Sequence, residues 1–247
     1  NVVSYTSNKH QIKFPYMIEN TLLPASDIVK DLGVIFDNKL TFNMHINNLL
    51  STANRNLGLI IRMGRDFKES KTLTTLFNTY VRSRLEYAST IWTPHTKIYC
   101  KKIEQIQSKF LRYLTFKETG HYPKLDNCAT LIPNHNVLSL EQRRIVTDML
   151  YLFKIFNNQI DCSIILSKFQ FRIPSTCTRV RNYQLLYTPR RRTDILKKSP
   201  TWRLSSVYNA LNLSEKDCDC CKLCFQTFKG NIVNILRDTN LFINRQA

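Results

Sequence analysis

The chain has 247 residues, 43% of them hydrophobic, which is enough to bury one large core or two modest ones. Its 36 Lys and Arg against 18 Asp and Glu give a formal net charge of +18, a balance that favours polyanionic partners such as nucleic acid or acidic membrane surfaces. No apolar run approaches the roughly 20 residues of a membrane-spanning helix, and the N-terminal residues lack a signal-peptide core, so we expect an intracellular, nuclear and cytoplasmic protein with no membrane partner.

The first 37 residues are predicted to form short strands. The segments Gln11–Phe14 and Met17–Leu22 are expected to pair as a hairpin around Pro15 and Tyr16. The apolar run Leu32–Phe36 predicts a further strand, because the turn-forming pair Asp37-Asn38 follows it directly.

A long amphipathic helix is predicted after this strand, with Thr41 as its N-cap. Its apolar residues recur at three- and four-residue steps: Phe42, Ile46, Leu49, Leu50, Ala53, Leu57, Ile60 and Ile61. On the opposite side lie Asn48, Ser51, Arg55 and Arg62, and no acidic residue occurs between Asn38 and Arg65. Such a face suits phosphate oxygens, although an ordinary solvated surface remains the alternative.

Two further amphipathic helices complete a predicted three-helix bundle. One spans 70–87, with Ser70 as its N-cap, and the other spans 97–117. The second has a polar side that repeats the character of the first helix, formed by Lys101, Gln105, Lys109 and Arg112.

The C-terminal half is predicted to be mostly helical with a few short strands. Residues 118–136 lack periodicity and contain Gly120, Pro123 and Pro133, so they are the predicted linker. Ser139 and Gln142 have the spacing of a capping box, which predicts a helix from there to Phe156. Beyond it we expect short strands at 169–173 and 179–187 and helices at 201–211 and 221–236. The chain is thus mainly α, with strands at 1–37, a helical bundle at 38–117, a linker at 118–136 and a basic domain at 137–247.

A basic and aromatic segment stands out in that last domain. In an extended strand, Arg179, Arg181, Tyr183 and Tyr187 would share one side, and Arg190, Arg191 and Arg192 follow. Arginines can hold the phosphates of a single strand while tyrosines stack on its bases. The alternative is a solvated basic loop whose tyrosines pack inward.

Other candidate sites carry weaker signals. Cys218, Cys220, Cys221 and Cys224 could bind a metal ion, but four thiolates within seven residues are hard to wrap around one tetrahedral ion, so we favour thiols in place of small apolar residues. His45 has no second ligand at helical spacing, which favours a polar residue at a helix start. The five glycines are too far apart for a nucleotide-binding loop, and no adjacent Asp-Asp pair exists to hold catalytic Mg²⁺.

Four segments together resemble the reverse transcriptases of non-LTR retrotransposons of the jockey type. They read KDLGVIFDNKLTFNMHI at 30–46, LFNTYVRSRLEY at 76–87 with IWTP at 91–94, IEQIQSKFLRYL at 103–114, and LSLEQRR at 138–144. The resemblance covers most of the chain from about Lys9 onward, in the same order.

This resemblance implies that the strands at 1–37 are the tail end of the polymerase palm, just after its catalytic centre, and that the thumb and the region after it follow. The implied partners are template RNA and primer DNA, together with the missing palm and fingers. No cofactor is implied for this chain, since Mg²⁺ belongs to the catalytic part whose carboxylates it lacks. We therefore expect a nucleic-acid-binding fragment that is not catalytic alone, the alternative being an inactive or host-adopted remnant that binds proteins.

Overall fold

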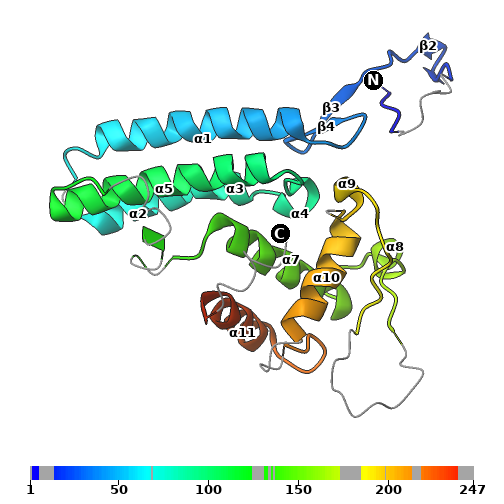
Figure 1. Cartoon of the computed structure of the whole chain (residues 1–247). Coiled ribbons are helices and arrows are strands. Elements are labelled where there is room, and N and C mark those ends of the chain that lie inside the picture. The colour runs from blue at the N-terminus through cyan, green and yellow to red at the C-terminus, as the bar shows by residue number, and fades with distance from the viewer. Residues whose placement is uncertain are drawn as a thin grey trace. The chain divides into compact units, whose positions relative to one another are not determined.

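The computed structural model describes residues 2–5, 14–67, 69–123, 131–132, 135, 137–172, 185–197, 199–212 and 218–238. Over these residues the chain is mainly helical, with short antiparallel strands at its N-terminal end, as the sequence predicts (Figure 1). It divides into two compact units, one formed by 1–88 and 94–106 and the other by 89–93 and 107–247. The structure describes 118–123, 131–132 and 135 of the predicted linker at 118–136, whose first two residues belong to the helix before it; the linker as a whole stays a prediction.

Two small hairpins open the first unit. Strand β1 (Met17–Ile18) pairs with β2 (Thr21–Leu22), and β3 (Ile28–Asp31) pairs with β4 (Val34–Asp37). The first turn therefore lies at Glu19 and Asn20, not at Pro15 and Tyr16 as predicted, and residues 11–13 fall outside the described part.

The predicted strand at 32–36 begins two residues too early. Leu32 and Gly33 form the turn between β3 and β4, with positive φ angles of 43° and 86°. Glycine adopts this backbone conformation without strain, whereas Leu32 is strained by it, and its side chain is 84% exposed. The strand prediction missed β3 because Ile28–Asp31 is exposed and shows no apolar alternation.

Asp37 controls the passage from β4 into helix α1 (Asn43–Met63). Its carboxylate accepts hydrogen bonds from the backbone N–H groups of Lys39, Thr41 and Phe42 at 2.7–3.0 Å and from the Thr41 hydroxyl at 2.8 Å. The sequence predicts Thr41 as the N-cap, and this prediction is wrong. The cap position belongs to Phe42, which adopts a left-handed conformation and makes no side-chain cap bond. The carboxylate of Asp37 thus orders the backbone before α1, whereas the first N–H groups of the helix receive no side-chain cap.

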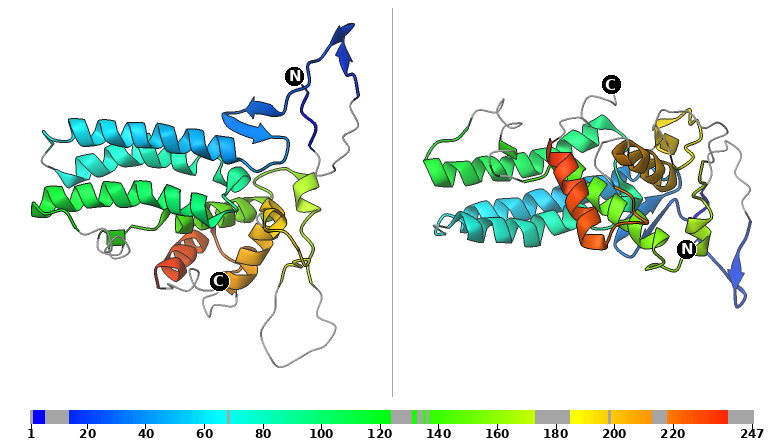
Figure 2. Two further views of the ribbon diagram at one scale, coloured as in Figure 1. Left: turned by 45° about the horizontal axis from the view of Figure 1, so that its top comes forward. Right: turned by 90° about the horizontal axis from the view of Figure 1, so that it is seen from below.

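The predicted second helix of the bundle is a chain of three segments. They are α2 (Ser70–Phe77), a π-helical turn η1 (Asn78–Arg82) and α3 (Ser83–Glu86), and the cap residue is Glu69 in place of Ser70. The wider π turn presents the Tyr80 carbonyl to α1, where Asn56 Nδ2 donates to it at 2.9 Å. Helix α5 (Lys97–Thr119) extends the predicted third helix by two residues. Figure 2 shows α1 running alongside the segments of α2 and α3.

The second unit is built on α7 (Leu140–Phe156), whose predicted capping box is confirmed. Ser139 Oγ accepts from Gln142 N at 3.1 Å, and Gln142 Oε1 accepts from Ser139 N at 2.9 Å. The same unit contains the following shorter helices: α4 (Ser89–Trp92), α8 (Ser163–Leu166), α9 (Asp194–Lys197), α10 (Pro200–Asn212) and α11 (Phe225–Asp238). Helix α11 starts four residues later than predicted, because 218–224 form a turn.

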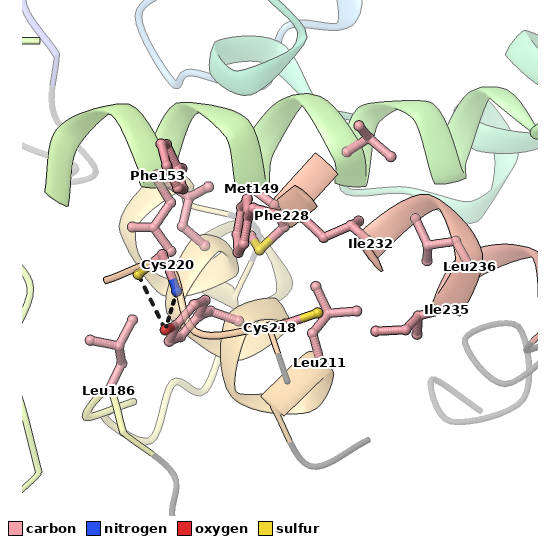
Figure 3. Packing of buried hydrophobic residues seen from close by; sticks show 14 of the residues in the cluster. Met149, Phe153, Leu186, Leu211, Cys218, Cys220, Phe228, Ile232, Ile235 and Leu236 are labelled. Atoms are coloured by element: carbon pink, nitrogen blue, oxygen red, sulfur yellow. Dashed lines mark hydrogen bonds between the residues drawn. The ribbon is translucent and has the colours of Figure 1, made fainter. Parts of the chain in front are cut away.

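The core of this unit lies between α7, α10 and α11 (Figure 3). Met149 and Phe153 of α7 meet Phe228 and Ile232 of α11, and the rings of Phe153 and Phe228 are 5.0 Å apart. The predicted strands at 169–173 and 179–187 are reduced, in the described residues, to one bridge between Phe171 and Leu186.

Candidate nucleic-acid interface

The predicted polar face of α1 is exposed along its whole length. Asn48, Ser51, Arg55 and Arg62 are all exposed, whereas Ile46, Leu50, Ala53, Leu57 and Ile60 are buried. At 100° per residue the four polar side chains lie within about 60° of one another around the helix axis. They extend over about 21 Å, a length in which one strand of a duplex presents about six phosphates.

This face, which we call the α1 face, also carries apolar side chains that the sequence prediction left out. Met44 lies in the same sector of the helix, Leu59 lies about 20° and Met63 about 60° beyond its edge, and the three are 52%, 49% and 59% exposed. The sequence already shows these apolar residues among the polar positions of the helix. Arginine, asparagine and serine beside methyl groups can contact both phosphates and sugars, but methyl groups also suit a protein surface.

Helix α5 carries the second predicted group. Lys101 and Lys109 are exposed, one in each unit of the chain. Arg112 is half-buried, and its Nε donates to the Pro123 carbonyl at 3.3 Å. One donor of the Arg112 guanidinium is therefore used to bind the backbone that follows α5. Sequence periodicity could not indicate this contact.

The third predicted group is only partly described. Arg179, Arg181 and Tyr183 lie outside the described residues, whereas Tyr187 and Arg190, Arg191 and Arg192 are exposed. The loop of 187–192 is anchored on both sides. Asn209 of α10 pairs with Leu186 through both of its amide atoms, at 3.0 and 2.7 Å, and Trp202 Nε1 donates to the Pro189 carbonyl at 2.9 Å.

The side-chain amide of Asn209 thus satisfies the backbone N–H and C=O of Leu186 in the way that a neighbouring β-strand would. Leu186 points inward and is fully buried, which leaves Tyr187 pointing outward with 51% of its surface exposed. The exposure of Tyr187 supports the predicted stacking role over an inward-packed tyrosine at this one position.

His45 packs helix α1 against β4. It is buried, and its Nδ1 accepts from the Ile35 N–H at 3.3 Å. Burial lowers the pKa of His45 below its ordinary value, so the ring is neutral near pH 7. A buried, neutral histidine that holds a backbone donor has a structural role, as the sequence favoured.

The cysteines divide between the core and the surface. Cys218 and Cys220 are buried, and Cys221 and Cys224 are exposed. Burial raises the pKa of the Cys220 thiol, and hydrogen bonds from Thr227 lower the pKa of Cys224, which directly precedes α11. Cys218 and Cys220 both belong to the hydrophobic core cluster, although the buried sulfur of Cys220 lies 3.2 Å from the Tyr208 hydroxyl oxygen.

Comparison with protein-family models, curated proteins and solved structures found no match. Within the described part of the chain, no helix combines the length and the hydrophobicity that crossing a membrane requires.

Proposed function

We propose that this chain is the nucleic-acid-binding thumb and C-terminal portion of a non-LTR retrotransposon RNA-directed DNA polymerase, which holds template RNA and primer DNA. The observation that carries this proposal is the α1 face, where two arginines, an asparagine and a serine are exposed along about 21 Å without a carboxylate in that stretch of sequence. The net charge of +18 and the ordered sequence resemblance support it.

Hydrogen-bond donors on this face are suited to positioning a duplex and not to reading its sequence. Arginine forks, amides and hydroxyls contact phosphate and sugar, which are the same for every base pair. The binding should therefore depend on salt and only weakly on sequence. Synthesis of DNA is a property of the catalytic part, so the 247 residues alone should not extend a primer when Mg²⁺ is added.

The test measures affinity of the whole chain for an RNA–DNA duplex over a range of salt concentrations. Arg55→Ala with Arg62→Ala should weaken binding and reduce the slope of log K against log salt by about two units if each arginine neutralises one phosphate. Arg84→Ala provides the control for each single arginine change, because Arg84 is an exposed arginine of the same unit on a different helix. A salt-independent affinity, or equal effects of Arg84→Ala and of either single change, would refute phosphate binding by the α1 face.

The exposed methyl-bearing side chains favour a second candidate, a protein-interaction module. Leu59 and Met63, one turn apart on α1, would then form the contact, with Arg62 beside them, whereas Met44 lies about 22 Å from Leu59 along the helix. The variant Leu59→Ser distinguishes nucleic-acid binding from protein binding. It should leave the salt slope for duplex binding unchanged if phosphate contacts supply most of the affinity. A chain that binds no duplex at low salt would favour the protein partner.

A further inference from the structure

The turn that leads into α11 brings three metal-binding groups together. A carboxylate oxygen of Asp219 and the sulfurs of Cys220 and Cys221 all lie within 4.8 Å of one another. The two sulfurs are 4.0 Å apart, far beyond the bonding distance of a disulfide. Two thiolates on a tetrahedral zinc ion, each at about 2.3 Å, lie about 3.8 Å apart, so the observed separation already matches the edge of such a site.

We propose that Asp219, Cys220 and Cys221 form a binding site for a thiophilic divalent cation, with Zn²⁺ as the expected ion and solvent as its fourth ligand. Carboxylate oxygen and thiolate sulfur are both ordinary zinc ligands. Binding replaces the two S–H bonds by S–metal bonds and releases two protons to the solvent. This site is independent of the α1 face and of nucleic-acid binding.

The surrounding contacts hold the three groups in place. Asp219 Oδ1 accepts from the Cys221 N–H at 2.9 Å, which fixes the turn, and its Oδ2 lies 3.5 Å from Lys222 Nζ. The Lys222 side chain is 76% exposed, so an incoming cation can displace its ammonium group into solvent at little cost.

Cys220 is held from inside the unit. Its carbonyl accepts from Asn157 Nδ2 at 2.9 Å, and the Tyr208 hydroxyl oxygen lies 3.2 Å from its sulfur and 3.3 Å from its backbone nitrogen (Figure 3). A hydroxyl can donate as well as accept. When metal binding removes the thiol proton of Cys220, the Tyr208 hydroxyl can therefore donate to the resulting thiolate. Cys221, on the exposed side, provides the route of entry.

The test uses the whole chain, reduced with a phosphine and freed of metal. Titration with Cd²⁺ should produce an ultraviolet sulfur-to-metal charge-transfer band that saturates at one equivalent, and Zn²⁺ should abolish it by competition. Cys221→Ser should lower the affinity at least about tenfold, since even the loss of a group that only supports a ligand has an effect of that size. The absence of a saturable band, or unchanged affinity in Cys221→Ser, would overturn the proposal.

Two further variants test the ligand set. Asp219→Asn should weaken Cd²⁺ binding while the band per bound ion keeps its intensity, because both sulfurs remain. Cys162→Ser, a thiol outside the turn, should change nothing. Cys224→Ser should also leave one equivalent bound, because Cys224 is not among the three groups; loss of binding in that variant would overturn the assignment.

Discussion

Asp148 and Arg203 form a buried ion pair in the second unit. Arg203 Nε lies 2.7 Å from Asp148 Oδ2, and the side chain of Arg203 is only 9% exposed and that of Asp148 only 3%. The same guanidinium donates to Asp148 Oδ1 at 3.3 Å and to the Thr90 carbonyl at 2.7 Å. One arginine thereby links α10 to both α7 and α4.

Removing the carboxylate of this pair should destabilise the unit strongly. Asp148→Ala leaves the Arg203 cation in the core, and we expect the free energy of unfolding to fall by about 3–5 kcal/mol, measured by chemical denaturation. Glu86→Gln is the control, because Arg82 and Glu86 form a partly exposed pair at 3.6 Å worth at most about 1 kcal/mol. Equal losses in the two variants would contradict this role of Asp148.

Asp37 should stabilise the start of α1. Asp37→Ala removes the acceptor of three backbone N–H groups, and we expect a loss of about 1–2 kcal/mol in unfolding free energy, comparable to the loss of a strong helix cap. Asp31→Ala, at an exposed position of β3, should cost much less. If both changes cost the same, the hydrogen bonds of Asp37 do not stabilise the turn.

Acid should weaken the same turn. Burial alone would raise the pKa of Asp37, but hydrogen bonds from Thr41, Phe42 and Lys39 outweigh it and lower the pKa below the ordinary 3.8. The contribution of Asp37 is therefore complete above pH 3.8 and is lost as the pH falls through the lowered pKa. Unfolding of Asp37→Asn, followed by circular dichroism, should show less of this acid dependence than the parent.

His45 should make stability depend on pH nearer neutrality. Burial lowers its pKa from 6.5, so the unfolded chain binds a proton at a higher pH than the folded chain does. Its contribution is complete above pH 6.5 and decreases as the pH falls from there towards the folded pKa. His45→Asn keeps an acceptor for the Ile35 N–H but cannot titrate, so its melting temperature should fall less between about pH 7.5 and 5.5. An identical fall in both proteins would rule out His45 as the source.

Variants in the loop of 187–192 should distinguish binding of phosphates by arginines from stacking of bases on a tyrosine. Replacing Arg190, Arg191 and Arg192 by Ala should weaken binding to every sequence and reduce the salt slope by about one unit for each phosphate that these arginines neutralise. Tyr187→Leu should keep the slope and cost about 1–3 kcal/mol on single strands, with little change on duplex. Because Tyr187 is exposed, its replacement should leave the melting temperature unchanged. A triple arginine variant that binds as tightly as the parent at every salt concentration would exclude this loop.

Periodicity and local chemistry determined the long helices α1 and α7. The steps from Ile46 to Ile60 place one side of α1 in the core, and the spacing of Ser139 and Gln142 fixes the start of α7. These features depend on residues within a few positions of one another, so the sequence shows them directly. The exposure of Arg55 and Arg62 follows from the same periodicity.

Tertiary contacts decided the features that the sequence left open. Asp148 pairs with Arg203, and Asn209 with Leu186, across sequence separations of 55 and 23 residues. No local pattern encodes a partner at that distance; packing of α7, α10 and their neighbours brings these groups together, and burial then makes each pairing obligatory.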